Sequence, residues 1–413
     1  EWRYKALGAS SQCRGEYCLV NLWIEHYPEG LGEPDNGFDP GYQIVIKEGA
    51  GPPWRLAEHY EVAARARGAE PPEWVWEIGL WVTTYYSEGL PEGPHVRRLS
   101  IEELLEAIRL VREALGYPLA LHCYSWFKGE FDANNPSYEP VEGARGYFES
   151  LRRLGVRIVP YVNARLWDIG WRWGEEPYKY AVKLAGPRLR PGAHALAYEI
   201  YPTSGQIHAV MCPAAEGWKR RILEIARTVK DLGADGVYLD QIAAAPPYLC
   251  LDAGHGHPRG GGGWWAKAYR ELLAQIAEEG LLVVSELEAE AYVGALHGLL
   301  DWVSFASGFY PLHIALYGGK VVYLGRSFAM HEISNADLLA AKLGEQIAYG
   351  VQPGWIDVFR LAKAVERTEV LEVLRTYGEA YRHINWIFRA HKIDLGAVAQ
   401  FDEKTFYLSI DPE

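Results

Sequence analysis

The sequence is short of methionine, of cysteine and of long apolar runs, and these shortages exclude whole classes of protein. No window approaches about 20 consecutive apolar residues, so we expect no membrane-spanning helix. Lys and Arg number 41 against 54 Asp and Glu, and the net charge of −13 argues against a nucleic-acid backbone as the main partner. The five cysteines form no CxxC motif, and their odd number and wide spacing define no disulfide framework.

The cysteines do not indicate whether the protein is secreted or cytoplasmic. Cys13 and Cys18 are close enough to bridge in an oxidising compartment, whereas Cys123 and Cys212 are interpreted as buried, unreactive thiols. The chain starts at Glu1 without a signal-peptide pattern, so we expect either a removed leader or a processed piece of a longer chain. Only two Met, with abundant Ala, Arg, Glu and Pro, is typical of a thermostable protein.

Apolar and aromatic residues, by contrast, are plentiful. Hydrophobic residues make up 49% of the chain and charged residues 23%, which excludes a disordered, collagen-like or coiled-coil protein. The 16 Trp and 27 Tyr far outnumber the 11 Phe. Aromatic rings that carry a polar group suit wet, partly apolar surfaces such as sugar-binding clefts, and thick barrel cores use them as well.

The hydrophobic pattern divides the chain into three parts. Residues 1–70 are predicted to form a small N-terminal β appendage with a lead-in helix, from strand-like alternation at Cys18–Glu25 and Tyr42–Lys47 and helical spacing at Trp54–Gly68. Residues 71–391 alternate short apolar runs with amphipathic helices. Residues 392–413 form a C-terminal extension with a short β segment near Thr405–Ile410.

Eight strands alternating with helices predict an α/β fold of the (β/α)8 TIM-barrel type. The predicted strands are Trp74–Thr84, Leu119–Tyr124, Arg157–Asn163, Gly236–Gln241, Leu281–Glu286, Asp301–Phe305, Val321–Leu324 and a weak one near Ala348–Ile356. The clearest helices are Ser100–Leu115, Val141–Leu154, Ala215–Leu232, Trp264–Glu279, Asn335–Glu345 and about Arg367–His391. An open doubly wound sheet would want a GxGxxG turn, which is absent. The long aromatic-rich insertion after strand three, residues 165–213, is expected to shape a site.

Carboxylates end two consecutive predicted strands. Asp240 ends strand four and Glu286 ends strand five, each after an apolar run. Catalytic groups of such barrels lie at the C-terminal strand ends, and adjacent parallel strands lie about 4.8 Å apart. The pair can therefore approach the separation of about 5–5.5 Å that retaining glycosidases use, with one carboxylate as nucleophile and the other as acid/base. The shorter Asp240 suits the nucleophile, and the longer Glu286 suits the acid/base.

Two further acids leave the choice on strand five open. Strand alternation would point Glu286, Glu288 and Glu290 the same way, so periodicity does not decide between Glu286 and Glu288 as the acid/base. Glu286 is preferred because the apolar run ends directly before Ser285. A structural role for either acid, as a helix cap or a partner of an Arg, is the alternative.

Other polar and aromatic side chains near strand ends are candidates for binding sugar hydroxyls or stacking on a sugar ring. The candidate substrate-binding residues are Trp81, His122, Tyr124, Trp126, Asn163, Arg165, Trp167, Tyr238, Gln241, Glu288, Arg326 and Trp355, with Thr83, Tyr161 and Gln352 beside them. Core packing or loop anchoring is the alternative for each one.

The segment DAGHGH places Asp252, His255 and His257 close together. Its spacing matches no standard zinc pattern and its glycines suggest an exposed loop that covers the site, so no metal and no cofactor are predicted. A serine nucleophile is not indicated, because GxSxG is absent.

The segments GADGVYLDQI and VVSELE resemble the retaining α-glycosidase barrels of the wider α-amylase type. The chain is most similar to the branch that contains endo-α-N-acetylgalactosaminidases, and to a related family of unassigned function that also shares FYPLHIALYG and LGEQIAYGVQPGW, over about residues 70–390. The resemblance implies Asp240 as nucleophile and Glu286 as acid/base. α-Amylases have Arg where this chain has Tyr238, and a His-Asp pair where it has Gly325 and Arg326, so starch is not implied.

The sequence thus predicts a retaining glycoside hydrolase, with α-linked carbohydrate as substrate and without nucleic acid or membrane as partner. A non-catalytic carbohydrate-binding barrel is one alternative. A metal-dependent hydrolase that uses the DAGHGH loop is another.

Overall fold

The computed structural model describes most of the barrel region and parts of both ends of the chain. The described residues are 5–15, 17–34, 68, 70–84, 100–129, 133–170, 175–185, 194–201, 205–301, 312–325, 330–389, 393–394 and 409–410. The predicted strand Tyr42–Lys47 and nearly all of the predicted helix Trp54–Gly68 lie outside these residues. Among the helices of the described ranges, none combines the length and the apolar character that a membrane crossing requires.

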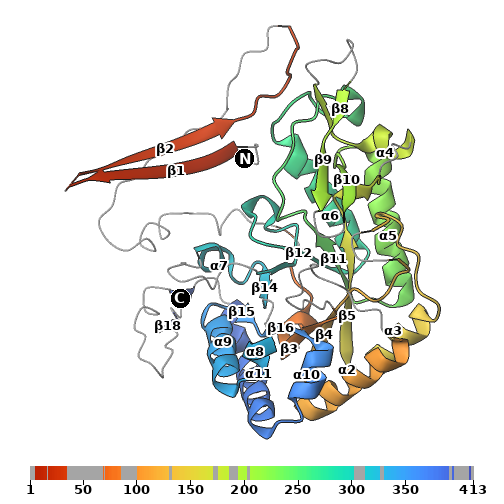
Figure 1. The fold of residues 1–413 in the computed structure, drawn as a ribbon, viewed down its shortest axis with the longest axis vertical. Helices are drawn as coiled ribbons and strands as arrows, with labels where there is room; N and C mark the ends of the chain where they lie inside the picture. Colours follow the sequence, from red (N-terminus) through yellow and green to blue (C-terminus); the bar gives the residue numbers. More distant parts are fainter. Residues whose placement is uncertain are drawn as a thin grey trace.

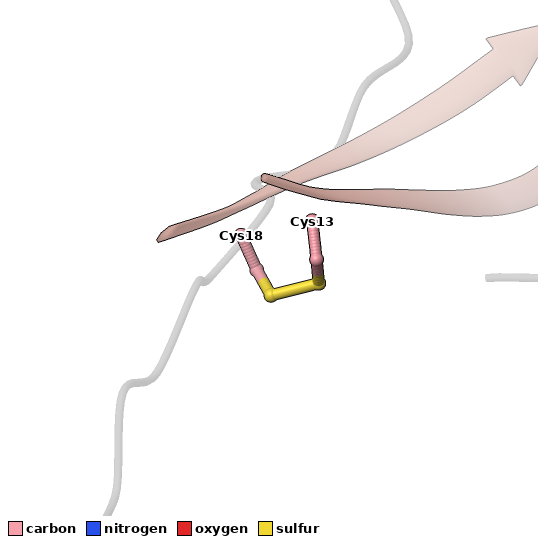
Figure 2. Close-up of a disulfide and its surroundings, with 2 residues drawn as sticks. All are labelled: Cys13 and Cys18. Atoms are coloured by element: carbon pink, nitrogen blue, oxygen red, sulfur yellow. A yellow bond between two sulfur atoms is a disulfide. The ribbon is translucent and has the colours of Figure 1, made fainter. Parts of the chain in front are cut away.

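An antiparallel hairpin forms the N-terminal end of the described chain. β1 (Lys5–Arg14), which the sequence analysis did not predict, pairs along its whole length with β2 (Tyr17–His26). The register places Cys13 opposite Cys18, and the two sulfurs form a disulfide next to the turn that joins β1 and β2 (Figure 2). The prediction that this pair can bridge is therefore confirmed. The hairpin extends away from the helices and strands of the barrel (Figure 1).

A nine-stranded parallel sheet forms the body of the molecule and is nearly closed into a barrel (Figure 1). In sheet order its strands are β15 (Val351–Gln352), β14 (Val322–Leu324), β13 (Gly298–Leu300), β12 (Leu282–Glu286), β11 (Gly236–Asp240), β5 (Val156–Asn163), β4 (Leu119–Cys123), β3 (Leu80–Thr83) and β16 (Gly354–Asp357). The first and last strands of this order are separated in sequence by Pro353 alone. All residues of β3, β4 and β11 are buried, as expected for parallel strands covered on both faces.

Three strand predictions need correction. The predicted strand Trp74–Thr84 begins later, because η1 (Glu73–Glu77) is a short 3-10 helix. The strand predicted at Asp301–Phe305 instead lies at Gly298–Leu300, and residues 302–310 are outside the described chain. The weak strand near Ala348–Ile356 is two short strands, and Ala348 ends a helix.

Helices follow the strands and pack on the outside of the sheet (Figure 1). They are α2 (Ile101–Leu115), α3 (Ala144–Arg153), α5 (Glu216–Leu232), α6 (Trp264–Glu278), α7 (Leu312–Tyr317), α8 (Met330–Ile333), α9 (Ala336–Ala348), α10 (Val358–Ala364) and α11 (Thr368–Arg389). The predicted capping box is present, since the Ser100 hydroxyl accepts from the Glu103 amide and the Glu103 carboxylate accepts from the Ser100 amide, both at 3.1 Å. Asn335 caps α9 in the same way through the Leu338 amide.

The insertion after β5 folds into strands of its own. β6 (Leu166–Asp168), β10 (Gln206–Val210) and β9 (Tyr198–Tyr201) form an antiparallel sheet, β7 (Lys183–Ala185) pairs with β8 (His194–Leu196), and α4 (Glu175–Tyr180) lies between β6 and β7. Because the insertion leaves β5 at Asn163, it lies at the C-terminal end of the barrel strands. The remaining short elements are η2 (Ala253–His255), η3 (Glu290–Tyr292), β17 (Ile393–Asp394) and β18 (Ser409–Ile410).

Candidate active site

Asp240 and Glu286 are the last residues of two neighbouring strands, β11 and β12. In the register of these strands Tyr238 lies opposite Val284, so the same register continued by two residues brings Asp240 level with Glu286. On its other side β11 pairs with β5, where Asp240 lies opposite Asn163. The two predicted carboxylates therefore leave the sheet at the same level and at the same end of the barrel.

Two donors from β5 hold the Asp240 carboxylate. The Tyr161 hydroxyl donates to Oδ2 at 3.0 Å, and the Asn163 side-chain amide approaches the same oxygen at 3.4 Å. Asp240 is 9% exposed, so this oxygen is held mainly by protein groups. Hydrogen bonds of this kind favour the negatively charged form of a carboxylate.

Tyr238 connects the two acids. Its buried hydroxyl donates to Oε2 of Glu286 at 2.9 Å. Burial, together with the negative charges of Glu286 and Asp240, raises the pKa of Tyr238 well above its ordinary value. The hydroxyl therefore keeps its proton at any physiological pH and remains a hydrogen-bond donor. This bond crosses from β11 to β12, the two strands whose register places Asp240 level with Glu286.

An aromatic wall continues the site toward β4 and β16. Tyr124 stacks on Tyr161 with ring centroids 4.5 Å apart, and the ring of His122 lies 4.0 Å from Tyr238. The indole N–H of Trp355 donates to Nδ1 of His122 at 2.8 Å. Burial lowers the pKa of His122 to about 3, so the ring is neutral and can accept this bond. His122, Tyr124, Tyr238 and Trp355 are thus brought together with the acids, as the sequence predicted for a single site.

Arg165, which is only 1% exposed, and the half-buried Gln241 meet between the insertion and β11. Arg165 Nη1 donates to Gln241 Oε1 at 3.1 Å and to Glu199 Oε1 at 2.6 Å. The guanidinium also lies over the ring of Tyr248, 5.4 Å from its centroid. Gln241 has a φ of +68°, so the chain turns sharply directly after Asp240. Sequence analysis missed Glu199 and Tyr248, because nothing in a single sequence pairs an insertion with a distant loop.

The glutamate that ends β12 and the two that follow it do not share one direction. Leu287 has a φ of +59°, which ends the alternation that was expected to point them the same way. Glu286 faces Tyr238, whereas the charge of Glu288 acts on the buried hydroxyl of Tyr323 on β14. Glu290 is exposed and begins η3. Of the three, Glu286 is the one that binds Tyr238 and lies level with Asp240 in the strand register.

Three of the predicted binding residues lie away from the two acids, and a fourth lies outside the described residues. Trp81 is buried and donates to Gln352 at 2.6 Å, and Gln352 in turn donates to Tyr381 on α11. Trp126 is fully buried and donates to the Tyr161 carbonyl at 2.9 Å. These contacts give Trp81 and Trp126 packing roles.

Trp167 is directed to the outside of the barrel. Its ring lies 6.0 Å from that of Trp218 on α5, and the guanidinium of Arg221 lies over it. The fourth residue, Arg326, is outside the described residues. Trp81, Trp126 and Trp167 therefore pack within the fold, away from the group around the two acids.

The expectation that the DAGHGH loop is exposed holds for Ala253, Gly254 and Gly256 but is wrong for the two histidines. His255 and His257 are 8% and 7% exposed, and they lie beside Cys212 and Cys250, whose side chains are fully buried. The imidazole of His257 stacks on Trp264 with centroids 3.6 Å apart, which draws this loop inward.

Two curated proteins align with about the same share of the chain. A "Putative glycoside hydrolase" of Bacteroides thetaiotaomicron is 29% identical over 264 residues, which are 62% of this chain and 38% of that protein. A similarly named protein of Monosiga brevicollis is 28% identical over 279 residues, 62% of this chain and 23% of its own length. The chain thus spans well under half the length of these relatives.

Solved glycosidase structures share the fold. The α-N-acetylgalactosaminidase NagBb from Bifidobacterium bifidum, in its GalNAc complex, has a TM-score of 0.67 and 14% identity over 96% of this chain and 66% of its own. The α-galactosidase TtGalA from Thermus thermophilus, in complex with stachyose, has a TM-score of 0.52 and 14% identity over 79% of this chain and 69% of its own. At this identity the likeness shows an α/β-barrel fold. A family model described as "Domain of unknown function (DUF6259)" matches residues 50–328, and the chain belongs to that family.

Proposed function

We propose that this chain is a retaining glycoside hydrolase for α-linked sugars, with Asp240 as nucleophile and Glu286 as acid/base. We count β15 and β16 as one interrupted eighth strand of a (β/α)8 barrel. In this proposal residues 71–391 form the catalytic barrel, residues 1–70 an appendage and residues 392–413 an extension. The names of the two curated relatives and of the glycosidases that share the fold support this class of activity.

The observation that carries the proposal is the position of Asp240 and Glu286 at the neighbouring ends of β11 and β12, with Tyr238 of β11 hydrogen-bonded to Glu286. Neighbouring parallel strands lie about 4.8 Å apart, and retaining glycosidases hold their carboxyl groups about 5–5.5 Å apart. Inverting enzymes need about 6.5–9.5 Å, to admit a water molecule between the general base and the sugar. Adjacent positions at the ends of β11 and β12 therefore fit the retaining geometry.

The environment of each acid fits a different role. Asp240 receives hydrogen bonds from Tyr161 and Asn163, which favour its ionised form, so we assign the attack on the anomeric carbon to this carboxylate. As the carbon–oxygen bond to the leaving group breaks, Glu286 gives its proton to that oxygen. In the second step Glu286 takes a proton from water, whose oxygen displaces Asp240 and restores both acids.

The surrounding residues supply recognition. Tyr124 and Trp355 are buried, so in this proposal they fix the shape of the site around Tyr161 and Tyr238 and do not contact the sugar. The half-buried Gln241 forms a polar rim that can bind hydroxyl groups, and the buried Arg165 holds its side chain in place. The glycosidases that share the fold are named for α-linked galactose and N-acetylgalactosamine, so α-galactosides and α-N-acetylgalactosaminides are the first substrates to test.

The test is a panel of nitrophenyl glycosides with wild type, Asp240→Asn and Glu286→Gln. Each substitution is expected to lower turnover by several orders of magnitude, with unchanged circular dichroism. Glu288→Gln makes the same chemical change two residues from Glu286, and Asp231→Asn makes the Asp240 change on the exposed face of α5; both should stay within a few-fold of wild type. Binding without release for every panel member would favour a carbohydrate-binding barrel and overturn the proposal.

Stereochemistry and residue roles have separate tests. Proton nuclear magnetic resonance of the first product should show the α anomer, and a β product would refute the retaining mechanism. A mechanism-based cyclitol epoxide should esterify Asp240, as peptide mass spectrometry would show. Azide should rescue Glu286→Ala to an α-glycosyl azide. Labelling of another acid, or rescue of Glu288→Ala instead, would reassign the roles.

A further inference from the structure

Four metal-binding side chains meet outside the candidate active site. They are Cys212, Cys250, His255 and His257, and their ligand atoms all lie within 4.8 Å of one another. Cys212 follows β10 at the end of the insertion, and the other three belong to the loop between β11 and α6. Two thiols and two imidazoles are the ligand set of structural zinc sites.

Each histidine has one ring nitrogen aimed at a sulfur and the other bound to a backbone carbonyl. His257 Nε2 lies 3.4 Å from Cys212 Sγ, while its Nδ1 lies 2.7 Å from the Pro258 oxygen. His255 Nδ1 lies 3.6 Å from Cys250 Sγ, while its Nε2 lies 2.8 Å from the Lys179 oxygen. A nitrogen that contacts a carbonyl must carry the proton, so the nitrogen that faces the sulfur has its lone pair free. Zinc-binding histidines show this arrangement.

The distances and the charges fit a tetrahedral ion. Zinc bonds of about 2.3 Å to sulfur and about 2.05 Å to nitrogen at a tetrahedral angle put sulfur and nitrogen about 3.6 Å apart. The observed separations of 3.4 and 3.6 Å agree with this value. Two thiolates would balance the two positive charges of the ion, and buried charge is tolerated only when it is balanced in this way.

Backbone hydrogen bonds and an ion pair hold the segments that carry these side chains. The Cys212 amide donates to the Tyr180 carbonyl at 2.9 Å, and Cys250 exchanges two backbone hydrogen bonds with Gly260, of 3.1 and 2.7 Å. Lys183 on β7 forms an ion pair with Asp252, which precedes His255 by three residues. Both sulfurs are fully buried, so a substrate cannot reach them and a cysteine nucleophile is excluded.

We propose that Cys212, Cys250, His255 and His257 form a closed, structural Zn²⁺ site that fastens the insertion to the loop after β11. That loop begins at Gln241 and carries Tyr248, against which the Arg165 guanidinium packs. The ion would therefore hold the rim of the candidate active site in place without touching a substrate. This proposal does not depend on the glycosidase assignment.

The metal content of the purified full-length chain tests the site. Inductively coupled plasma mass spectrometry after gel filtration should find one zinc per chain in wild type and in Cys123→Ser, whose thiol lies beside Tyr147 in another part of the core. Cys212→Ser and His257→Asn should lose the zinc. Equal zinc in these variants and in wild type, or folded wild type that takes up none from added Zn²⁺, would overturn the proposal.

Cobalt provides a readout that does not need the variants to fold. Wild type loaded with Co²⁺ should show thiolate-to-cobalt charge-transfer absorption and the strong visible bands of a tetrahedral ion, and one equivalent of Zn²⁺ should abolish both. A cobalt spectrum without a thiolate band would refute the site. So would a Cys212–Cys250 disulfide, found by peptide mass spectrometry, in chain that was isolated with zinc present.

Discussion

His297 offers a quantitative test of how burial couples the fold to pH. The residue directly precedes β13 and is 5% exposed. Its Nδ1 accepts from the Val283 amide at 2.9 Å, its own amide donates to the Val283 carbonyl, and its carbonyl accepts from the Val322 amide. Burial lowers the pKa of His297 from 6.5 to about 4. The ring is therefore neutral in the folded protein, and protonation would break the bond to β12.

The sign and size of the effect follow from linkage. The unfolded chain takes up this proton below pH 6.5 and the folded chain only near pH 4, so the contribution of His297 is complete above pH 6.5 and is lost as the pH falls toward 4. With a pKa of 6.5 in the unfolded state and about 4 in the folded state, the free energy of unfolding falls by about 2 kcal/mol between pH 8 and pH 5. That loss is a sizeable part of a typical stability of about 5–15 kcal/mol.

The His297→Asn variant isolates this contribution, because the Asn oxygen can accept from the Val283 amide but cannot be protonated. Urea unfolding at pH 8 and pH 5 should show a pH-dependent loss about 2 kcal/mol smaller in the variant than in wild type. The same substitution at the exposed His383 on α11 is the control and should leave the wild-type difference unchanged. Equal losses in His297→Asn and wild type would refute the reasoning.

Two further predictions concern the ends of β11 and β12. Tyr161→Phe removes a donor from Asp240. Since a hydrogen bond to a charged group contributes about 1.5–3 kcal/mol, kcat/KM on an activated glycoside should fall about ten- to hundredfold. The control Tyr147→Phe on α3, whose hydroxyl contacts the Cys123 thiol, should leave kcat/KM unchanged. Ser285→Ala removes the hydroxyl that binds the Leu239 carbonyl and the Ala243 amide. The free energy of unfolding, measured by urea titration, should therefore fall by about 1–3 kcal/mol. The control Ser150→Ala on α3 should lose less. An activity loss in Tyr147→Phe as large as in Tyr161→Phe, or unchanged stability in Ser285→Ala, would contradict these assignments.

The strands around the two acids could be predicted because each apolar run there ends at a charged residue. The predicted ends at Asp240 and Glu286 stand close to the observed ends of β11 and β12, since a carboxylate marks where burial stops. The strand Gly298–Leu300 is also followed by a carboxylate, Asp301, but the apolar residues that follow in the sequence led to the prediction of a strand that starts there. Periodicity locates an element best where polarity changes at its boundary.

Contacts between distant segments could not be predicted from one sequence. Trp81 looked suited to a sugar, yet its indole donates to Gln352, 271 residues away. The direction of Glu288 depends on the positive φ of Leu287, which no pattern announces. Cys212 stood alone in the sequence, and only the folded insertion brings it to Cys250 and the two histidines.

The way the sheet closes has a consequence for how the chain is made. β3 pairs with β16, and these two strands leave the ribosome at the beginning and near the end of the synthesis of the barrel. The edge of β14 stays unpaired until β15 has emerged, and the edge of β3 stays unpaired until β16 has emerged. Exposed edges favour pairing with other chains. Chains truncated before residue 351 should therefore aggregate during translation, whereas chains that stop after α11 should stay dispersed.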